Sequence, residues 1–98
     1  MWVNPRSTKN ISAKAYLDNK EDFLLLDVRT ENEFEDFNIG GIHIPLDELD
    51  ERMGEIPNNK PLVVTCASGI RSQKAIELLL ENYYPKTILN LEKGLSDL

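Results

Sequence analysis

The chain has 98 residues, of which 41% are hydrophobic and 29% are charged, and its formal net charge is −6. We expect residues 1–98 to form a single domain with one core, because this length suits one modest domain and the composition is not that of a disordered or fibrous chain. The acidic balance also argues against nucleic acid as a partner, since the 11 basic residues form no run that would neutralise phosphates.

Short helices and strands are predicted to alternate from the start of the chain. Asn10–Ile11 suggests a brief strand, and Ser12 is a suitable N-cap for a helix that runs to about Asp18. The apolar run Phe23–Leu26, which leads into Asp27–Val28, is typical of a strand buried on both faces of a parallel sheet.

A second short helix is expected after this strand. Thr30 is a suitable N-cap, and Glu33, three residues later, completes a capping box for a helix through Phe37. The pair Gly40-Gly41 is then expected to break the chain before the next element.

The middle of the chain continues the alternation. Ile42–Ile44 predicts a short strand, and Leu46–Met53 predicts a helix that ends at Gly54. Pro61–Thr65 is apolar and rich in β-branched residues, so it predicts another strand, which stops just before the single cysteine.

The longest helix is expected at Ser72–Asn82. Thr87–Leu91 predicts the last strand, and Glu92–Leu98 is too short for more than a loop and a frayed turn. The whole alternation predicts an α/β fold with a mostly parallel sheet of about five strands and helices on both faces. In the longest helix, four apolar side chains fall on one stripe that should face the sheet: Ala75, Ile76, Leu79 and Leu80.

Cysteine and histidine are scarce. Cys66 and His43 alone are too few for a structural zinc site or for a disulfide within the chain, so Cys66 is either an inert core residue or the centre of the chemistry. For His43 we expect a partly exposed strand residue, because no neighbour in sequence would make it a base. No apolar run approaches the roughly 18 to 20 residues that cross a bilayer, and Met1–Pro5 lacks the pattern of a secretion signal, so we expect a cytoplasmic protein without a membrane segment.

The segment Cys66–Ser72 joins a buried strand to a helix, which is where open α/β sheets bind ligands. Backbone N–H groups in such a loop and in the first helical turn form a nest that should lower the pKa of the Cys66 thiol and favour the thiolate. Gly69 lets the loop curl tightly, Arg71 adds a positive charge, and Ser72 either caps the helix or donates to the sulfur. Arg71 has an alternative role, an ion pair with a surface glutamate.

This loop, which reads Cys-x-x-Gly-x-Arg, resembles the active-site loop of the rhodanese family, which is also followed by a helix. Further segments resemble that family in the same order along the chain, from about Ile11 to Gly94, and the ordered set is much more specific than one cysteine loop. Asp27-Val28-Arg29 with Glu33-Phe34 is similar to the family's D-V-R with E-F. Ile44-Pro45-Leu46 is similar to its I-P-L, and Leu91 with Gly94 is similar to its terminal L-x-G-G.

Three departures from the family pattern lie in the loops around the cysteine. Phe37-Asn38-Ile39 stands where many members have G-H-I, and Gly40–His43 is one residue shorter than the usual form. Lys93-Gly94 stands in place of the terminal double glycine, and the usual final tryptophan is absent.

The resemblance implies a rhodanese-like domain with sulfurtransferase activity, in which the Cys66 thiolate takes a sulfane sulfur from thiosulfate, a persulfide or a polysulfide and passes it to a thiol or cyanide. It implies no cofactor and no metal, and it leaves a protein sulfur donor or acceptor open as a partner. Asp27 and Arg29 are expected to hold the loops around the pocket. The expected substrate-binding residues are those of the loop, Ala67, Ser68, Gly69, Ile70, Arg71 and Ser72.

Two other functions stay open. A non-catalytic rhodanese-like module would bind or regulate a partner through the pocket, although it would have no chemical need for a thiol in an anion nest. Cysteine phosphatase or arsenate reductase chemistry is a weaker alternative, because the phosphatases resemble one another in a wider C-x5-R loop, whereas Cys66 to Arg71 is C-x4-R. The small uncharged side chains of Ala67 and Ser68 lead us to expect a persulfide, rather than thiosulfate, as the better donor.

Overall fold

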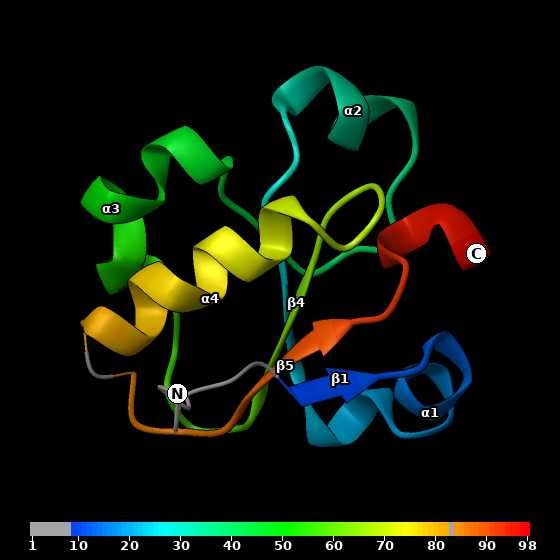
Figure 1. The fold of residues 1–98 in the computed structure, drawn as a ribbon, viewed down its shortest axis with the longest axis horizontal. Helices are drawn as coiled ribbons and strands as arrows, with labels where there is room; N and C mark the ends of the chain where they lie inside the picture. Colours follow the sequence, from blue (N-terminus) through cyan, green and yellow to red (C-terminus); the bar gives the residue numbers. More distant parts are fainter. Residues whose placement is uncertain (1–8, 83) are drawn as a thin grey trace, which may run out of the picture.

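The computed structural model of the protein describes residues 9–82 and 84–98. These residues form a five-stranded sheet in the order β1-β5-β4-β2-β3, and every neighbouring pair of strands is parallel (Figure 1). The predicted α/β fold with a mostly parallel sheet of about five strands is therefore confirmed. The strands are β1 (Lys9–Ile11), β2 (Leu24–Asp27), β3 (Ile42–His43), β4 (Leu62–Thr65) and β5 (Ile88–Leu91).

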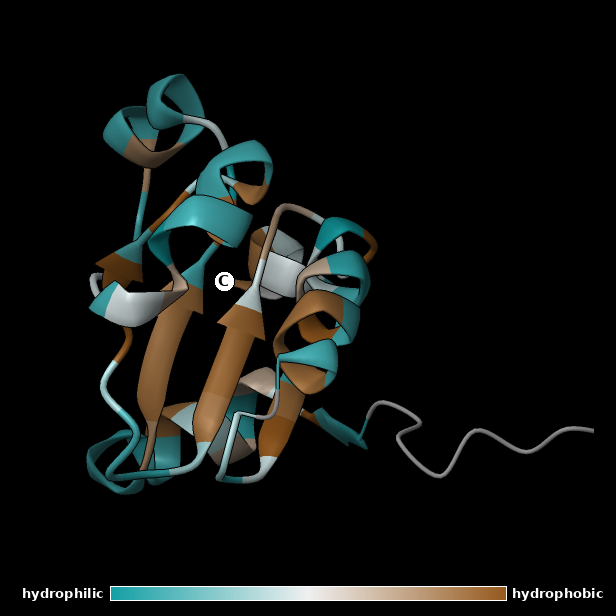
Figure 2. Ribbon diagram, turned by 90° about the vertical axis from the view of Figure 1, so that its left-hand side faces the viewer, coloured by the Kyte–Doolittle hydropathy of each residue, from teal (hydrophilic) through white to brown (hydrophobic). Residues whose placement is uncertain are grey.

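Helices cover both faces of the sheet, as predicted. Helices α3 and α4 lie on one face and α1 lies on the other, while α2 projects beyond the carboxyl ends of the strands (Figures 1 and 2). The described residues form α1 (Ala13–Asp18), α2 (Glu31–Asp36), α3 (Leu49–Arg52) and α4 (Arg71–Glu81), together with the 3₁₀ turns η1 (Lys20–Asp22), η2 (Leu46–Glu48), η3 (Met53–Glu55) and η4 (Gly94–Asp97).

The sheet divides the core into two clusters, because successive side chains of a strand point to opposite faces. In β4, Leu62 and Val64 pack with residues of α3 and α4, whereas Val63 packs with Tyr16 of α1. These three side chains of β4 are fully buried, and each stabilises the fold by about 1.5–3 kcal/mol relative to exposure. Burial on both faces is the reason why β4 is an almost entirely apolar run.

Both helix starts that were predicted from capping residues are confirmed. The Ser12 hydroxyl accepts the Ala15 N–H at 3.1 Å. Thr30 and Glu33 form a capping box: Thr30 Oγ1 accepts the Glu33 N–H at 3.3 Å, and Glu33 Oε1 accepts the Thr30 N–H at 3.1 Å. Such a cap typically stabilises a helix by about 1 kcal/mol.

The predicted helix over Leu46–Met53 is confirmed only in its middle, where α3 covers Leu49–Arg52. The segment is divided into η2, α3 and η3 because the backbone leaves regular helical geometry at Glu48, where φ is −105° and ψ is −7°, and again at Arg52, where φ is −116° and ψ is 10°. The last turn also runs to Glu55 instead of ending at Gly54.

The predicted stripe of α4 does face the sheet. Ala75, Ile76 and Leu79 are buried, and Leu80 is partly buried against the same cluster. Within residues 9–82 and 84–98, no helix is both long and apolar enough to cross a membrane. Met1–Pro5, on which the expectation about secretion rests, lies outside the described residues.

Candidate active site

Cys66 begins the loop between β4 and α4. Strand β4 ends at Thr65, the loop comprises Cys66–Ile70, and α4 begins at Arg71. The loop lies at the carboxyl ends of the parallel strands and below α2 in the view of Figure 1. This is the edge at which open parallel sheets bind ligands.

The Cys66 sulfur faces the backbone of this loop. Its Sγ accepts the N–H of Gly69 at 3.1 Å and the N–H of Ser72 at 3.3 Å, and the thiol donates to Ser72 Oγ at 3.6 Å. The loop and the first turn of α4 therefore curl around the sulfur, as the sequence predicts. Cys66 is also 0% exposed and borders the apolar cluster beneath α4, so the sulfur is closed to solvent in this conformation.

The pKa of the Cys66 thiol is lowered from its ordinary value. Burial acts in the opposite direction, because it favours the neutral thiol. Hydrogen bonds with the side chain and the N–H of Ser72, joined by those from the N–H groups of Ser68 and Gly69, outweigh the effect of burial. The nucleophilic thiolate is thus more populated at neutral pH than in a free cysteine.

Gly69 gives the loop its tight curl. Its φ of 98° lies in the region that favours glycine, and this conformation points its N–H at the sulfur. Ser68 and Ile70 lie on the outside of the loop, where Ile70 is 72% exposed. Ala67 is partly buried.

Ser72 contacts the sulfur and does not cap α4. The N-cap of α4 is Ile70, which makes no side-chain capping bond. Ser72 is fully buried, and its hydroxyl donates to Oδ1 of Asn90 on β5. Asn90 is 4% exposed, and its Nδ2 donates to Gly69 O at 3.4 Å and to Asn10 Oδ1 at 3.2 Å.

Arg71 forms an ion pair with Glu33 of α2, which is the alternative role left open by the sequence. Each of the two Nη atoms of Arg71 lies 2.8 Å from a carboxylate oxygen of Glu33, and both side chains are 36% exposed. The hydrogen bonds with Glu33 are the largest cause of the raised pKa of Arg71, and the charge of Cys66 contributes to it. The guanidinium of Arg71 is thus held by Glu33 of α2.

Asp27 and Arg29 form a buried ion pair at the end of β2. Arg29 Nη2 lies 2.8 Å from Asp27 Oδ2, and the two residues are 5% and 0% exposed, respectively. Nη2 also donates to the Phe37 carbonyl oxygen at 2.6 Å, and Nη1 donates to the Glu33 carbonyl oxygen at 3.2 Å. The pair thereby anchors α2, which carries the partner of Arg71.

The turn η4 packs against the backbone of Cys66. The Leu95 N–H donates to the Cys66 carbonyl oxygen at 2.9 Å, and Leu95 is only 7% exposed. The prediction of a frayed turn after β5 is therefore wrong, because burial of Leu95 and this hydrogen bond hold the turn on the cysteine loop.

His43 lies on the edge strand β3, which β2 separates from β4. Its ring stacks on Phe34 with 4.2 Å between ring centroids, and Nε2 lies 2.8 Å from the Arg29 carbonyl oxygen. Nε2 carries the hydrogen in this pair, since a carbonyl oxygen can only accept. His43 is partly buried, which agrees with the expected strand role.

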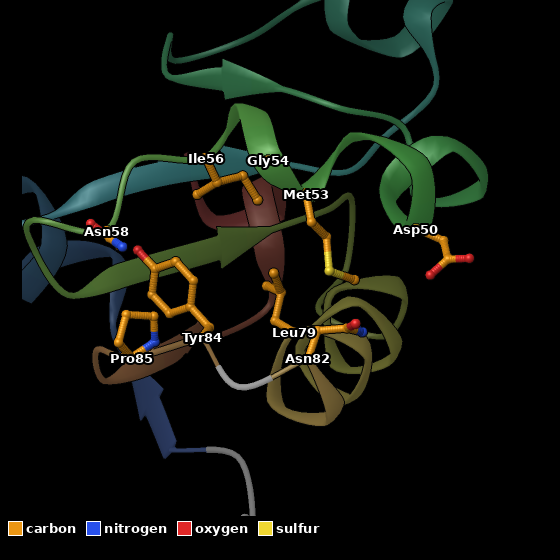
Figure 3. Close-up of a pocket in the computed structure, with 9 residues that line it drawn as sticks. All are labelled: Asp50, Met53, Gly54, Ile56, Asn58, Leu79, Asn82, Tyr84 and Pro85. Atoms are coloured by element: carbon orange, nitrogen blue, oxygen red, sulfur yellow. The ribbon is translucent and has the colours of Figure 1, made fainter.

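Two cavities flank α4. Figure 3 shows one of about 450 Å³ at the carboxyl end of the helix, opposite the cysteine loop. It is lined by Asp50, Met53, Gly54, Ile56, Asn58, Leu79, Asn82, Tyr84 and Pro85. The other cavity, of about 460 Å³, lies beside the start of α4 and is lined by Val28, Thr30, Pro45, Leu46, Asp47, Arg71, Lys74 and Leu78.

Sequence reasoning missed three contributors to this site. Asn90, Gly94 and Glu33 contact the cysteine loop or Arg71 from other elements. Asn90 had a usable signal, since it is the polar residue within the otherwise apolar strand Ile88–Leu91. Among residues 9–82 and 84–98, no group of three or more His, Cys, Asp or Glu side chains is placed to hold a metal ion.

The chain is similar in sequence to a known protein family and to several of its members. The sequence model of the rhodanese-like domain family matches residues 11–98. A sulfurtransferase of Allochromatium vinosum is 34% identical over 94 residues, which are 95% of this chain and 85% of the relative. The Bacillus subtilis protein YrkF, which is named as a candidate sulfur carrier, is 34% identical over 96% of this chain, and the chain spans only 52% of its length.

Solved structures of other proteins also resemble this chain in fold and sequence. A rhodanese-related protein from Thermoplasma volcanium superposes with a TM-score of 0.81 at 30% identity, over 91% of this chain and 88% of the other. A NAD-dependent persulfide reductase from A. fulgidus is 39% identical with a TM-score of 0.74, and the match covers 91% of this chain but 16% of that protein.

Proposed function

The chain belongs to the rhodanese-like domain family, and from this we propose that it is a sulfurtransferase that carries a sulfane sulfur atom as a persulfide on Cys66. The observation that supports this proposal most directly is that Cys66 Sγ accepts hydrogen bonds from the N–H groups of Gly69 and Ser72. A thiol with a lowered pKa at a strand-to-helix loop is suited to nucleophilic attack.

In the first half-reaction, the Cys66 thiolate attacks the outer sulfur of a persulfide donor, R–S–S⁻. A bond forms between Cys66 Sγ and that sulfur, while the S–S bond of the donor breaks and its electron pair leaves with R–S⁻. In the second half-reaction, an acceptor thiolate attacks the outer sulfur, and the bond to Cys66 breaks to restore the thiolate. The sulfane sulfur moves without net oxidation or reduction, and the covalent intermediate predicts ping-pong kinetics.

The loop would stabilise the charge of the persulfide. The outer sulfur carries a negative charge, and we expect it to lie among the N–H groups of the segment Ala67–Ser72. Because Gly69 and Ser72 already point their N–H groups at Cys66, little rearrangement is needed when charge moves outward by one atom.

A persulfide is proposed as a better donor than thiosulfate. Thiosulfate is a dianion, so its capture would benefit from free cations close to the cysteine. Here Arg71 is held by Glu33, and Ala67 and Ser68 carry no charge. A kcat/KM for thiosulfate of about 10⁷ M⁻¹s⁻¹ or more, near the upper range for enzymes, would contradict this preference.

Protein-bound persulfides are included among the proposed donors, and protein thiols among the proposed acceptors. One similar structure is named a persulfide reductase and one relative a candidate sulfur carrier, and in both the matching region is part of a longer chain. A partner of this kind would have to reach a cysteine that is 0% exposed. We therefore expect the exposed outer side of the loop, at Ser68 and Ile70, to shift when sulfur is transferred.

The proposal is tested by intact-mass spectrometry after incubation with thiosulfate and, separately, with a low-molecular-weight persulfide. The native protein should gain one sulfur atom, and cyanide should remove that atom with release of thiocyanate. The persulfide should load the protein faster than thiosulfate does.

Two variants provide the control. Cys66→Ala should gain no sulfur, whereas Glu77→Ala, which changes an exposed side chain on α4 outside the loop, should load normally. A native protein that gains no sulfur from either donor would favour a non-catalytic binding module. Hydrolysis of a chromogenic phosphate ester that depends on Cys66 would favour phosphatase chemistry instead.

A further inference from the structure

We propose that Asn90 is a positioning residue for the Cys66 thiolate and that it acts through Ser72 and Gly69. The inference rests on the proposed function of Cys66 and adds a residue from a different strand to the machinery. Asn90 lies on β5, next to β4 in the sheet, and its side chain is 4% exposed.

The Asn90 amide joins the two residues whose N–H groups contact the sulfur. Its Oδ1 accepts the Ser72 hydroxyl, and its Nδ2 lies 3.4 Å from the Gly69 carbonyl oxygen. The orientation of the amide follows from these partners, because the Gly69 carbonyl can only accept and must therefore face Nδ2. Asn10 Oδ1, at 3.2 Å from Nδ2, completes the set.

These contacts come from outside the loop and hold it at two points. The Gly69 N–H and the Ser72 N–H lie 3.1 Å and 3.3 Å from Sγ, so a small movement of either residue would lengthen a bond to the sulfur. Replacement of Asn90 by an apolar side chain would leave the Ser72 hydroxyl and the Gly69 carbonyl without this partner in a buried place. We expect the loop to move in order to satisfy them.

The test is the titration of Cys66 in Asn90→Leu, followed through the ultraviolet absorbance of the thiolate, with Cys66→Ser as the blank. This measurement needs neither a sulfur donor nor access to the buried sulfur. The variant should hold about tenfold less thiolate at neutral pH and should load sulfur from a persulfide about tenfold more slowly in a single turnover.

Leu89→Ala is the matched control, because Leu89 neighbours Asn90 on β5 but packs on the opposite face of the sheet. It should weaken the strand and leave the titration of Cys66 unchanged. Asn90→Ser provides a second variant, smaller and polar, in case Asn90→Leu does not fold, and it should change the titration in the same direction.

A double variant tests the route through Ser72. Ser72→Ala and Asn90→Leu share one hydrogen bond, so together they should reduce the thiolate by less than the product of their separate effects. If the double variant reduces the thiolate by the full product of the two separate effects, the route through Ser72 would be overturned. An unchanged titration of Cys66 in both Asn90→Leu and Asn90→Ser would overturn the proposal. A larger thiolate fraction in these variants would overturn it as well, because it would mean that Asn90 only competes with the sulfur for the hydrogen of the Ser72 hydroxyl.

These outcomes are separate from those of the proposed function. A native protein that accepts no sulfur, but whose thiolate titration depends on Asn90, would refute sulfur transfer and leave the positioning role intact. A native protein that accepts sulfur, but whose thiolate titration does not depend on Asn90, would refute the positioning role and leave sulfur transfer intact.

Discussion

Gly94 lies against the carbonyl group of Cys66. A Cβ atom added to Gly94 would stand 2.2 Å from the Cys66 oxygen and 2.7 Å from the carbonyl carbon of Ala67, and Gly94 itself has a φ of 56°. Together with the hydrogen bond from Leu95 to the same oxygen, this contact makes the turn after β5 a support for the cysteine loop.

Gly94→Ala should lower the free energy of unfolding by about 2–4 kcal/mol, because the new side chain adds backbone strain at a positive φ to overpacking against the loop. Urea unfolding measures this change. Gly54→Ala is the control, since no atom lies within 4 Å of a Cβ added there, and it should alter stability by less than about 1 kcal/mol. Equal effects of the two variants would contradict the contact seen at Gly94.

Lys93→Gly should stabilise the protein by about 0.5–1 kcal/mol. Lys93 has a φ of 60°, a left-handed conformation that is costly for any side chain, and the gain is reduced by the extra freedom of glycine in the unfolded chain. The midpoint of urea unfolding should therefore rise. Lys74→Gly, within α4, should change stability in the opposite direction by about 1 kcal/mol, and a fall in both variants would show that Lys93 is not strained.

The ion pair between Glu33 and Arg71 should make stability depend on pH in the acid range. Hydrogen bonds from Arg71 lower the pKa of Glu33 from 4.5 to about 2. A carboxyl group whose pKa is lowered by folding stabilises the protein above its unfolded pKa and loses that contribution as the pH falls through the folded pKa. The stabilisation should thus be complete above pH 4.5 and disappear toward pH 2.

Glu33→Gln tests this dependence, because glutamine preserves the capping box and removes the charge. At neutral pH the variant should be less stable by about 1 kcal/mol at most, since both side chains are partly exposed to solvent. The difference should shrink between pH 4.5 and pH 2. Glu35→Gln, an exposed change on the same helix, is the control, and a difference between native protein and Glu33→Gln that did not vary with pH would contradict the ion pair.

Arg29→Met should lower the free energy of unfolding by about 3–5 kcal/mol, because it leaves the carboxylate of Asp27 buried without its partner. Urea unfolding of the double variant Asp27→Leu/Arg29→Met should show a smaller loss than the two single variants predict by addition. Arg52→Met breaks exposed ion pairs with Glu48 and Glu55 and should cost less than about 1 kcal/mol. If Arg29→Met and Arg52→Met lowered the free energy of unfolding by similar amounts, the idea that burial makes the Asp27–Arg29 pair more costly to break would be refuted.

Much of the fold was predictable because it depends on short-range signals. The apolar run that contains β4, the caps at Ser12 and Thr30, and the stripe of α4 each occupy a few neighbouring residues and have one favourable local structure. The position of Cys66 at the end of a buried strand follows from the same signals. Leu46–Met53 was one exception, since its propensity for a helix did not indicate where the backbone would break.

The surroundings of the cysteine depend on contacts between distant parts of the chain. Arg71 and Glu33 are 38 positions apart, and Ser72 and Asn90 are 18 apart. With 17 acidic residues in the chain, the sequence offers many partners for one arginine, and the strand order β1-β5-β4-β2-β3 decides which of them comes within reach. Side-chain periodicity and capping act over a few residues, whereas the pairing of buried polar groups depends on which strands become neighbours, and only the assembled sheet establishes that.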